Sequence, residues 1–434
     1  MRLSIHKWAE LDEPQRLTLL QRPAVSQDES VRETAEAIVA AVLAKGDEAL
    51  VDITQQLDGV LMSNFRVSGE ELDTSGAQIS AGDLAAIDLA IANVGKFHEQ
   101  QLPGAISVET MPGVLCERIS QALDSVGLYV PAGTAPLPST AIMLAVPAIL
   151  ANCPRIILCT PPGPDGTADP AVLVAAARAG ITEIYKIGGA QAIAAMAYGT
   201  ESIPKVRKIF GPGNAWVTAA KTIVSADPHG ATIDMPAGPS ELLVIGDQAA
   251  SAEFIAADLL SQAEHGVDSQ VVFVTTDPSL ANRVQAEVDL QLEQLSRAEI
   301  AAAALENSVI VIAPDRESAI DISNRYAPEH LILHVEKARD AVSSVRNAGS
   351  VFVGQWSPES VGDYCSGTNH VLPTYGYAAT YSGLGVDQFM RQMTVQELSC
   401  EGLQSLGDAV IRLAGLEGLD AHAAAVSRRL VNES

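Results

Sequence analysis

The sequence predicts an α/β fold in which two incomplete Rossmann-like lobes, each built on a parallel sheet, accompany a helical N-terminal segment and a helical C-terminal tail. Three observations support this class. Helical periodicity fills about the first hundred residues, short apolar runs then alternate with helical segments in two series, and helical periodicity returns from about residue 395. Such alternation is typical of parallel sheets covered by helices.

The elements follow in order along the chain. Apolar residues at helical spacing predict helices across 30–57 and 82–98. The first alternating series predicts strands at 126–130, 156–160, 183–187 and 208–210, and the second predicts strands at 241–245, 270–275, 308–312, 330–335 and 350–353. The Pro- and Gly-rich segment 235–239 separates the two series, so we expect the lobe boundary there.

Charge and length limit the classes of partner. The chain has 434 residues, and 27 Lys and Arg stand against 53 Asp and Glu, which gives a net charge of −26. This charge repels phosphate backbones and anionic lipid. The longest apolar run, 140–151, is too short to span a bilayer, and the first residues lack a signal-peptide core. We therefore expect a cytoplasmic protein that binds neither nucleic acid nor membrane.

The five cysteines form no CxxC pair, so neither a disulfide framework nor a thiolate zinc site is expected. A nucleophilic role for Cys116 or Cys153 lacks an activating context, and a buried inert thiol is favoured.

Two glycine-rich turns follow predicted strands and open predicted helices. They are Gly188 to Gln191 and Gly211 to Trp216, the second with Trp where a dinucleotide fingerprint has its third Gly. Both turns could present backbone N–H groups to an anion, and both could equally be ordinary tight turns. The spacing alone leaves the two alternatives open.

A helix predicted from Ala252 to His265 carries a candidate metal site. Its buried stripe turns polar at Gln262 and reaches His265 one turn later, just before Gly266. An amide oxygen and an imidazole nitrogen at this spacing could bind a divalent metal. The alternative is a helix-end histidine bonded to a carbonyl.

The segment from Trp356 to His370 is too polar and Gly-rich for a core, so we expect a loop at a site. Asp363 could supply a carboxylate ligand, and His370 could be a ligand or a substrate contact. Both could instead cap turns through local hydrogen bonds.

The adjacent residues Glu329 and His330 are the candidates for proton transfer. Pro328 favours an extended Ala327, and His330 begins a strand, so the two side chains are expected to diverge. An imidazole suits proton abstraction from a substrate, and a carboxylate suits activation of a water. The alternative is a surface acid beside a structural histidine.

Four strings together resemble the histidinol dehydrogenase family over essentially the whole chain. They are IDMPAGPSELLV (233–244), DLLSQAEHG (258–266), YAPEHL (326–331) and GTNHVLPT (367–374). The resemblance implies oxidation of L-histidinol through the aldehyde to L-histidine with two NAD, at the end of histidine biosynthesis. It also implies Glu329 and His330 as catalytic residues.

The resemblance further implies the remaining site residues and a dimer. Zinc would be held by Gln262, His265, Asp363 and His422, which also face the substrate together with Ser240, His330, His370 and Glu417; NAD would contact Tyr129, Gln191 and Asn214. The family is a homodimer with exchanged tails, so Glu417 and His422 are expected to serve the partner's site.

The expected division of the chain follows the same pattern. It comprises an N-terminal segment (1–25), a larger lobe with the metal and catalytic residues (26–128 and 242–384), a smaller NAD-binding lobe (129–241) and a helical tail exchanged in the dimer (385–434). Two other classes stay open as alternatives to the dehydrogenase. They are a zinc hydrolase with Glu329 activating water, and a non-catalytic module that senses a histidine-like ligand.

Overall fold

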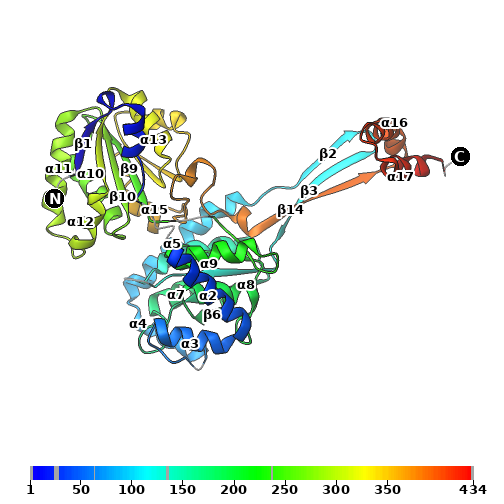
Figure 1. Ribbon diagram of the computed structural model, residues 1–434, viewed down its shortest axis with the longest axis horizontal. Helices are drawn as coiled ribbons and strands as arrows, with labels where there is room; N and C mark the ends of the chain where they lie inside the picture. The colour runs from blue at the N-terminus through cyan, green and yellow to red at the C-terminus, as the bar shows by residue number, and fades with distance from the viewer. Residues whose placement is uncertain (1–2, 24–28, 63, 133–135, 236–237, 432–434) are drawn as a thin grey trace.

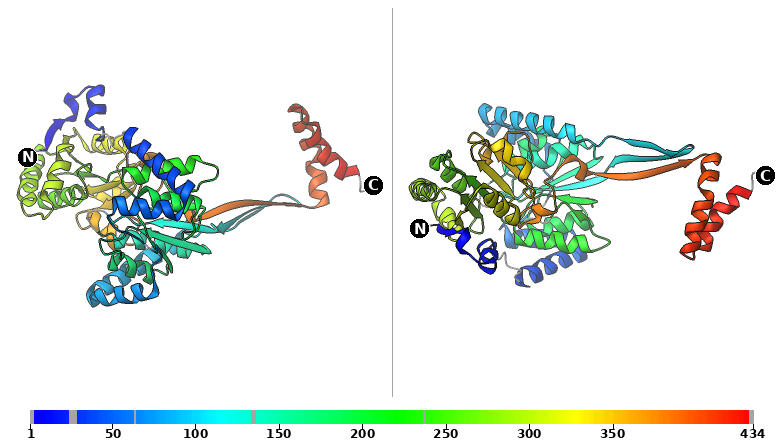
Figure 2. Two further views of the ribbon diagram at one scale, coloured as in Figure 1. Left: turned by 60° about the horizontal axis from the view of Figure 1, so that its bottom comes forward. Right: turned by 90° about the horizontal axis from the view of Figure 1, so that it is seen from above.

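The structure, a computed structural model, describes residues 3–23, 29–62, 64–132, 136–235 and 238–431. Two lobes lie side by side, and a long arm projects from them (Figures 1 and 2). Pro236 and Ala237, in the expected boundary segment, lie outside the described residues. Within the described part, no helix is both long and apolar enough to cross a membrane.

The first lobe is built on a six-stranded parallel sheet in the order β1-β11-β10-β9-β12-β13. Its strands are β1 (Ser4–Lys7), β9 (Glu241–Gly246), β10 (Gln270–Thr275), β11 (Val309–Ile312), β12 (His330–His334) and β13 (Ser350–Val353). Its helices are η1 (Trp8–Glu10), α1 (Glu13–Leu19), α10 (Ala252–Ala263), α11 (Pro278–Leu292), α12 (Ala298–Glu306), α13 (Arg316–Tyr326), α14 (Ala338–Ala341), η3 (Val342–Ser344) and α15 (Glu359–Tyr364).

The second lobe is built on a five-stranded parallel sheet in the order β6-β5-β4-β7-β8. Its strands are β4 (Ser125–Tyr129), β5 (Arg155–Thr160), β6 (Glu183–Lys186), β7 (Lys208–Phe210) and β8 (Thr232–Ile233), and its crossover helices are α6 (Pro138–Leu150), α7 (Pro170–Arg178), α8 (Gly189–Tyr198) and α9 (Ala215–Ala226).

Both sheets are doubly wound. Apart from the edge strand β1, the strands of each sheet begin at a central strand, β9 or β4, continue to one side, and then cross to the other side at β12 or β7. This order is the Rossmann-like topology expected from the sequence, with a switch point between the central strand and the crossing strand. The predicted fold class is confirmed.

The N-terminal region divides between the lobes in a way that the sequence did not predict. Strand β1 extends the six-stranded sheet by pairing with β11. The helices α2 (Glu29–Lys45), α3 (Asp47–Leu57), α4 (Gly69–Gln78) and α5 (Ala81–His98) instead lie against the five-stranded lobe, as Figure 1 shows for the first two beside α8. The expected grouping of 26–128 with 242–384 is therefore corrected, because Val39, Val42 and Leu50 share one apolar core with Ile157 and Ile193.

The arm is a three-stranded antiparallel sheet that ends in two helices. It comprises β2 (Ile106–Met111), β3 (Val114–Ala122), β14 (Met390–Leu398), α16 (Cys400–Leu416) and α17 (Asp420–Val431). Strand β14 pairs with β3 along its whole length. The tail expected to be helical from 385 therefore begins with 3-10 turn η5 (Val386–Phe389) and a strand, since β14 completes a sheet with residues that are distant in sequence.

A linker between β13 and the arm ties the lobes together. It contains η4 (Tyr377–Ala379), and its apolar residues Val371, Leu384, Val386 and Phe389 enter the core of the five-stranded lobe. His98, just before η2 (Glu99–Gln101), is fully buried and contacts this linker. Its Nδ1 lies 2.8 Å from Oε1 of Gln101, and its Nε2 lies 3.3 Å from Nδ2 of Asn369. His98 thus satisfies both ring nitrogens in the neutral form.

This arrangement predicts an acid-dependent loss of stability. Burial lowers the pKa of His98, with the Gln101 hydrogen bond opposing it. As pH falls below about 6.5, the unfolded chain binds a proton at this residue before the folded chain does, so stability decreases. We expect the decrease in unfolding free energy from about pH 7 to 5 to be smaller in His98→Gln than in the unsubstituted protein. The exposed control His229→Gln should show the same decrease in unfolding free energy as the unsubstituted protein. An equal decrease in all three proteins would contradict this role of His98.

Candidate active site

Glu329 and His330 lie at the amino end of β12, where the strand enters the six-stranded sheet. His330 pairs in register with Leu242 of β9 and Ser350 of β13. Both side chains of the pair are buried, with 7% of Glu329 and 5% of His330 exposed. A surface acid beside a structural histidine is therefore excluded, since neither group reaches bulk solvent freely.

The two side chains turn toward each other and bind the backbone N–H and the carbonyl of the same residue, Glu241. The backbone N–H of Glu241 donates to Oε2 of Glu329 at 2.9 Å, and the carbonyl of Glu241 lies 3.2 Å from Nδ1 of His330. Because a carbonyl only accepts, Nδ1 carries a hydrogen and donates it. Oε2 of Glu329 also lies 3.5 Å from Nδ1. The predicted divergence of the two side chains is therefore wrong.

The turn before this pair explains the difference. Ala327 ends α13 with φ 51° and ψ 65°, in the left-handed region, and its N–H donates to the carbonyl of Ser323. The extended conformation predicted from Pro328 is thus wrong. A left-handed alanine is strained by about 1–2 kcal/mol, so tertiary contacts must hold it there.

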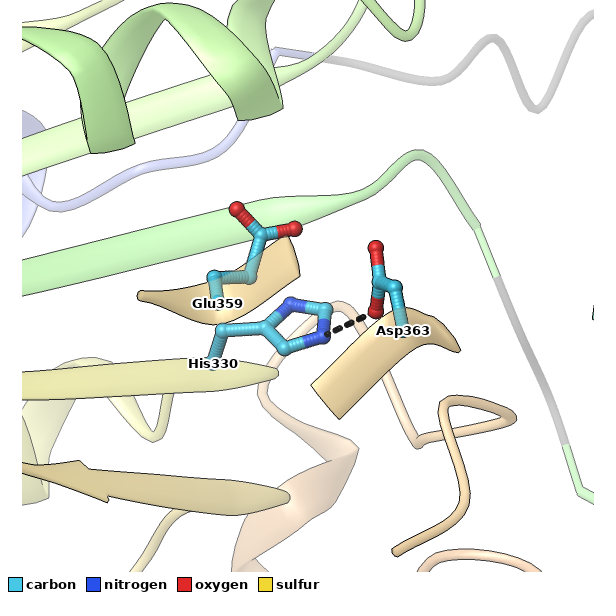
Figure 3. Close-up of side chains that lie close together, drawn as sticks. All are labelled: His330, Glu359 and Asp363. Carbon is cyan, nitrogen blue, oxygen red and sulfur yellow. Dashed lines mark ion pairs between the residues drawn. The ribbon is translucent and has the colours of Figure 1, made fainter. Parts of the chain in front are cut away.

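His330 is also part of a cluster with Glu359 and Asp363, whose ligand atoms lie within 4.8 Å of one another. Figure 3 shows the imidazole approaching the two carboxylates, which both come from α15. Nε2 of His330 lies 3.6 Å from Oδ1 of Asp363, an ion-pair distance that is too long for a hydrogen bond. The segment predicted as a loop therefore contains a short helix that places Asp363.

Glu359 was missed by the sequence reasoning. Its side chain is almost fully buried, and its Oε2 accepts a hydrogen bond from Ser261 at 2.9 Å. The spacing of Glu359 and Asp363 at i and i+4 could have indicated a shared helical face, had the segment been predicted to be helical.

The carboxylates determine the charge of the cluster. Burial by itself lowers the pKa of His330, but Glu329 and Asp363 outweigh it and raise the value well above the ordinary one. Burial raises the pKa of Asp363, but His330, His370 and His265 outweigh it and lower the value to about 2. Burial raises the pKa of Glu359 to about 8, against the charge of His330. The carboxylates of Glu329 and Asp363 therefore favour the protonated form of His330.

The predicted metal-binding residues Gln262, on α10, and His265, just after it, lie on the side of α10 that contacts α15. Gln262 is fully buried, and neither its Oε1 nor its Nε2 has a hydrogen-bond partner among the described residues. His265 is exposed, and its Nδ1 donates to the carbonyl of Ser261 at 2.9 Å, which leaves Nε2 as the ligand atom. Its charge acts on Asp363, so Asp363 and His265 are neighbours.

His370 and Ser240 flank the cluster. Nδ1 of His370 donates to the carbonyl of Asp363 at 2.9 Å, and its Nε2 lies 3.4 Å from Oγ1 of Thr140 in the other lobe. Ser240 directly precedes β9 and is half-buried. The fold therefore brings both predicted positions to the side of the six-stranded lobe that holds Glu329 and His330.

Glu417 and His422 lie elsewhere in this chain. Glu417 follows α16 and His422 belongs to α17, and both are exposed at the far end of the arm (Figure 1). A single chain therefore does not bring these two predicted positions to the cluster.

The comparisons with known proteins cover nearly the entire chain. The family model described as histidinol dehydrogenase matches residues 20–430. The chain is 53% identical to the histidinol dehydrogenase of Vibrio cholerae over 423 residues, which cover 98% of this chain and 97% of that protein. It is 51% identical to that of Yersinia pestis, with 98% of this chain and 95% of that protein covered.

A solved structure agrees with these relatives. The crystal structure of histidinol dehydrogenase from Elizabethkingia anophelis superposes with a TM-score of 0.95 at 44% identity, covering 99% of this chain and 98% of that one. The chain belongs to the histidinol dehydrogenase family. The resemblance inferred from the four strings is confirmed, and membership of the histidinol dehydrogenase family makes the chain an enzyme of dehydrogenase type.

The predicted cofactor positions of this histidinol dehydrogenase family member lie at the carboxyl side of the five-stranded sheet. Tyr129 ends β4, and its phenol oxygen accepts the N–H of Gly189 at 3.0 Å. Gln191 is buried, and its Oε1 has no hydrogen-bond partner among the described residues. Asn214 is exposed, and its Oδ1 accepts the N–H of Val217 as the N-cap of α9.

Two glycines lie beside these residues at positions where a side chain would clash. Gly189 has a φ of 64°, and a Cβ there would meet Oε1 of Gln191 at 2.5 Å. Gly211 has a φ of 120°, and a Cβ there would meet the carbonyl oxygen of Tyr129 at 2.1 Å. Each turn therefore requires glycine. The position at the carboxyl ends of the strands, near the switch point between β4 and β7, suits a dinucleotide.

Proposed function

We propose that this chain oxidises L-histidinol through L-histidinal to L-histidine, with two NAD as hydride acceptors and a bound zinc ion, at the end of histidine biosynthesis in the cytoplasm. Family membership supports the substrate. The observation that carries the chemistry is the buried pair Glu329 and His330, which binds the backbone N–H and the carbonyl of Glu241 and faces Asp363.

The donor set fits a divalent metal such as zinc. Asp363 stays ionised, His265 offers a free Nε2, and the orphaned amide of Gln262 offers a buried oxygen without another partner. We assign these three residues as ligands from one chain. When bound, the zinc ion would hold the imidazole and amino groups of the substrate, and the nicotinamide of NAD, beside Tyr129, Gln191 and Asn214, would accept hydride.

His330 would move the proton in the alcohol step. His330 would act in its neutral form, since engagement of Asp363 as a ligand would withdraw one of the anions that favour the protonated ring. The Nδ1 hydrogen stays on the carbonyl of Glu241, and Nε2 takes the hydroxyl proton as the carbinol C–H bond breaks. Ser240 and His370 lie where they could contact the substrate.

Glu329 would act in the aldehyde step. The N–H of Glu241 occupies its Oε2, and we assign Oε1 to the water that attacks the aldehyde carbon. The water loses a proton to the carboxylate, and the resulting hydrate loses its C–H hydride to the second NAD, with His330 again taking the hydroxyl proton.

The direct test uses the purified full chain with zinc, histidinol and NAD. We expect about two NADH for each histidinol consumed, with histidine as the product. Absence of NADH with metal and NAD present would refute the proposal. Amide or ester hydrolysis without NAD would favour the hydrolase alternative, and saturable histidinol binding without turnover would favour a sensor.

Gln262 allows a test of the metal site by stability. Replacement by Leu removes two unpartnered buried polar atoms, so the metal-free protein should become more stable by about 1–3 kcal/mol. The same substitution should lower zinc content, because one ligand is lost. Thermal unfolding in chelator and metal analysis after zinc loading measure the two effects. Destabilisation in chelator together with full zinc content would contradict the assignment.

We further propose a homodimer in which the partner's tail completes this site. Around the cluster, the six-stranded lobe exposes the large side chains of Phe254, Trp356, Val361 and Tyr364. The tail helices expose Leu413 and Leu416, with 61% and 83% accessible. Two such apolar surfaces on one chain favour a second copy, whose Glu417 and His422 would join Asp363.

A further inference from the structure

Arg22 connects the N-terminal segment to the amino end of β9. Its Nε and Nη2 donate to the two carboxylate oxygens of Glu241 at 2.5 and 2.8 Å. The Arg22 side chain is 14% exposed and that of Glu241 is 2% exposed, so this is a buried bidentate ion pair. The guanidinium also stacks over the Tyr326 ring, 4.1 Å from its centroid.

The same guanidinium holds the end of α13. Nη2 of Arg22 donates to the carbonyl of Tyr326 at 2.6 Å and approaches the carbonyl of Ala327 at 3.4 Å. Ala327 is the left-handed residue that brings the chain into Pro328 and Glu329. Arg22 therefore holds the strained turn that sets the positions of Glu329 and His330.

Glu241 carries the second connection. Its backbone N–H binds Glu329, and its carbonyl binds Nδ1 of His330. Its side chain is held by Arg22 and by the N–H of Tyr375, which donates to Oε1 at 2.7 Å. Fixing the side chain at both oxygens also restrains the backbone of Glu241, whose N–H and carbonyl bind Glu329 and His330.

We propose that Arg22 is a positioning residue for Glu329 and His330, acting on them through Glu241 and through the turn at Ala327. This inference rests on the proposed catalytic roles of the pair. Arg22 touches neither side chain, but it bonds to the segments on both sides of them. A displacement of about 1 Å in such a pair can cost about 100-fold in rate.

Charge supports the same role. Burial raises the pKa of Glu241, Arg22 opposes this, and the charge of Glu329 adds to it. Without the guanidinium, the buried carboxylate of Glu241 would lose its cation while the carboxylate of Glu329 binds the backbone N–H of the same residue. Lysine would keep the charge, but a single ammonium cannot reproduce the planar fork that spans two carboxylate oxygens and a carbonyl.

The experiment compares Arg22→Met and Arg22→Lys with Arg16→Met in the zinc-loaded full chain. Arg16 is a matched control, because it lies in the same segment, donates to the carbonyl of Trp8 and stacks on that ring without reaching Glu241. We expect kcat for NADH formation to fall about 100-fold in Arg22→Met and about 10-fold in Arg22→Lys. KM for histidinol should change less than about threefold, since Arg22 contacts none of the assigned zinc ligands Gln262, His265 and Asp363.

A second comparison separates positioning from folding. In the double variant Arg22→Met with Glu241→Gln, the buried carboxylate that Arg22 neutralised is removed as well, so the melting temperature should recover while kcat stays low. Recovery of kcat together with stability would overturn the proposal, as would equal losses in Arg22→Met and Arg16→Met. If the unsubstituted protein forms no NADH, the proposed function fails instead, so the two failures are distinguishable.

Discussion

Replacing His330 by Asn should slow both oxidation steps by about 10²–10⁴-fold, the range in which a positioned general base contributes. Nε2 of His330 faces the cluster, and its Nδ1 is committed to the carbonyl of Glu241, so no other atom of the ring can take the substrate proton. Asparagine can replace the Nδ1 contact but cannot accept a proton. Rates measured separately with histidinol and with histidinal check the prediction.

Glu329→Gln should affect the two steps unequally. Conversion of the aldehyde to the acid should fall by about 10²-fold or more, because an amide cannot accept the proton of the attacking water. The alcohol step should fall less. The alcohol step should still slow, since Oε2 of Glu329 lies 3.5 Å from Nδ1 of His330 and the carboxylate charge acts on that ring.

Matched controls for this pair are exposed residues of the same types. Glu336→Gln and His229→Asn lie at the surface and should keep the rates of the unsubstituted protein. Equal losses in both steps for Glu329→Gln would refute the division of roles between the two residues.

Mixing two inactive variants should restore activity if the partner's tail completes each site. Asp363→Ala removes a ligand from the body of the chain, and His422→Ala removes one from the tail, so each homodimer should be inactive. In a heterodimer, one site combines an intact Asp363 with the partner's His422. Random exchange makes about half of the dimers heterodimers with one intact site each, so about a quarter of full activity is expected.

Two further mixtures control this experiment. Asp363→Ala mixed with Gln262→Ala should stay inactive, because both positions belong to the body and every dimer then lacks a ligand in each site. If the His422→Ala homodimer alone is fully active, His422 is not needed at the site and the prediction is wrong. Failure of the Asp363→Ala and His422→Ala mixture to gain activity, despite heterodimers detected by mass, would show that the tail does not serve the partner.

Local patterns predicted the parts of the fold that local interactions determine. Strand and helix periodicity gave both parallel sheets, and the rule for doubly wound sheets holds in each of them. The same patterns failed for the arm, since β14 becomes a strand by pairing with β3, about 270 positions earlier in the chain. They also failed for helices α2 to α5, because apolar spacing shows that a helix has a buried face but not which sheet covers it.

The sequence by itself determined the family, because the four matching strings are long and ordered. Only the tertiary structure decided how Glu329 and His330 meet. A left-handed Ala327 overrides the local preference set by Pro328, and it is held by Arg22 from 305 positions away. The backbone N–H and carbonyl of Glu241, 88 positions from Glu329, then bring the two side chains together. Contacts over such separations have no signature in local spacing, since they form only when the sheet is complete.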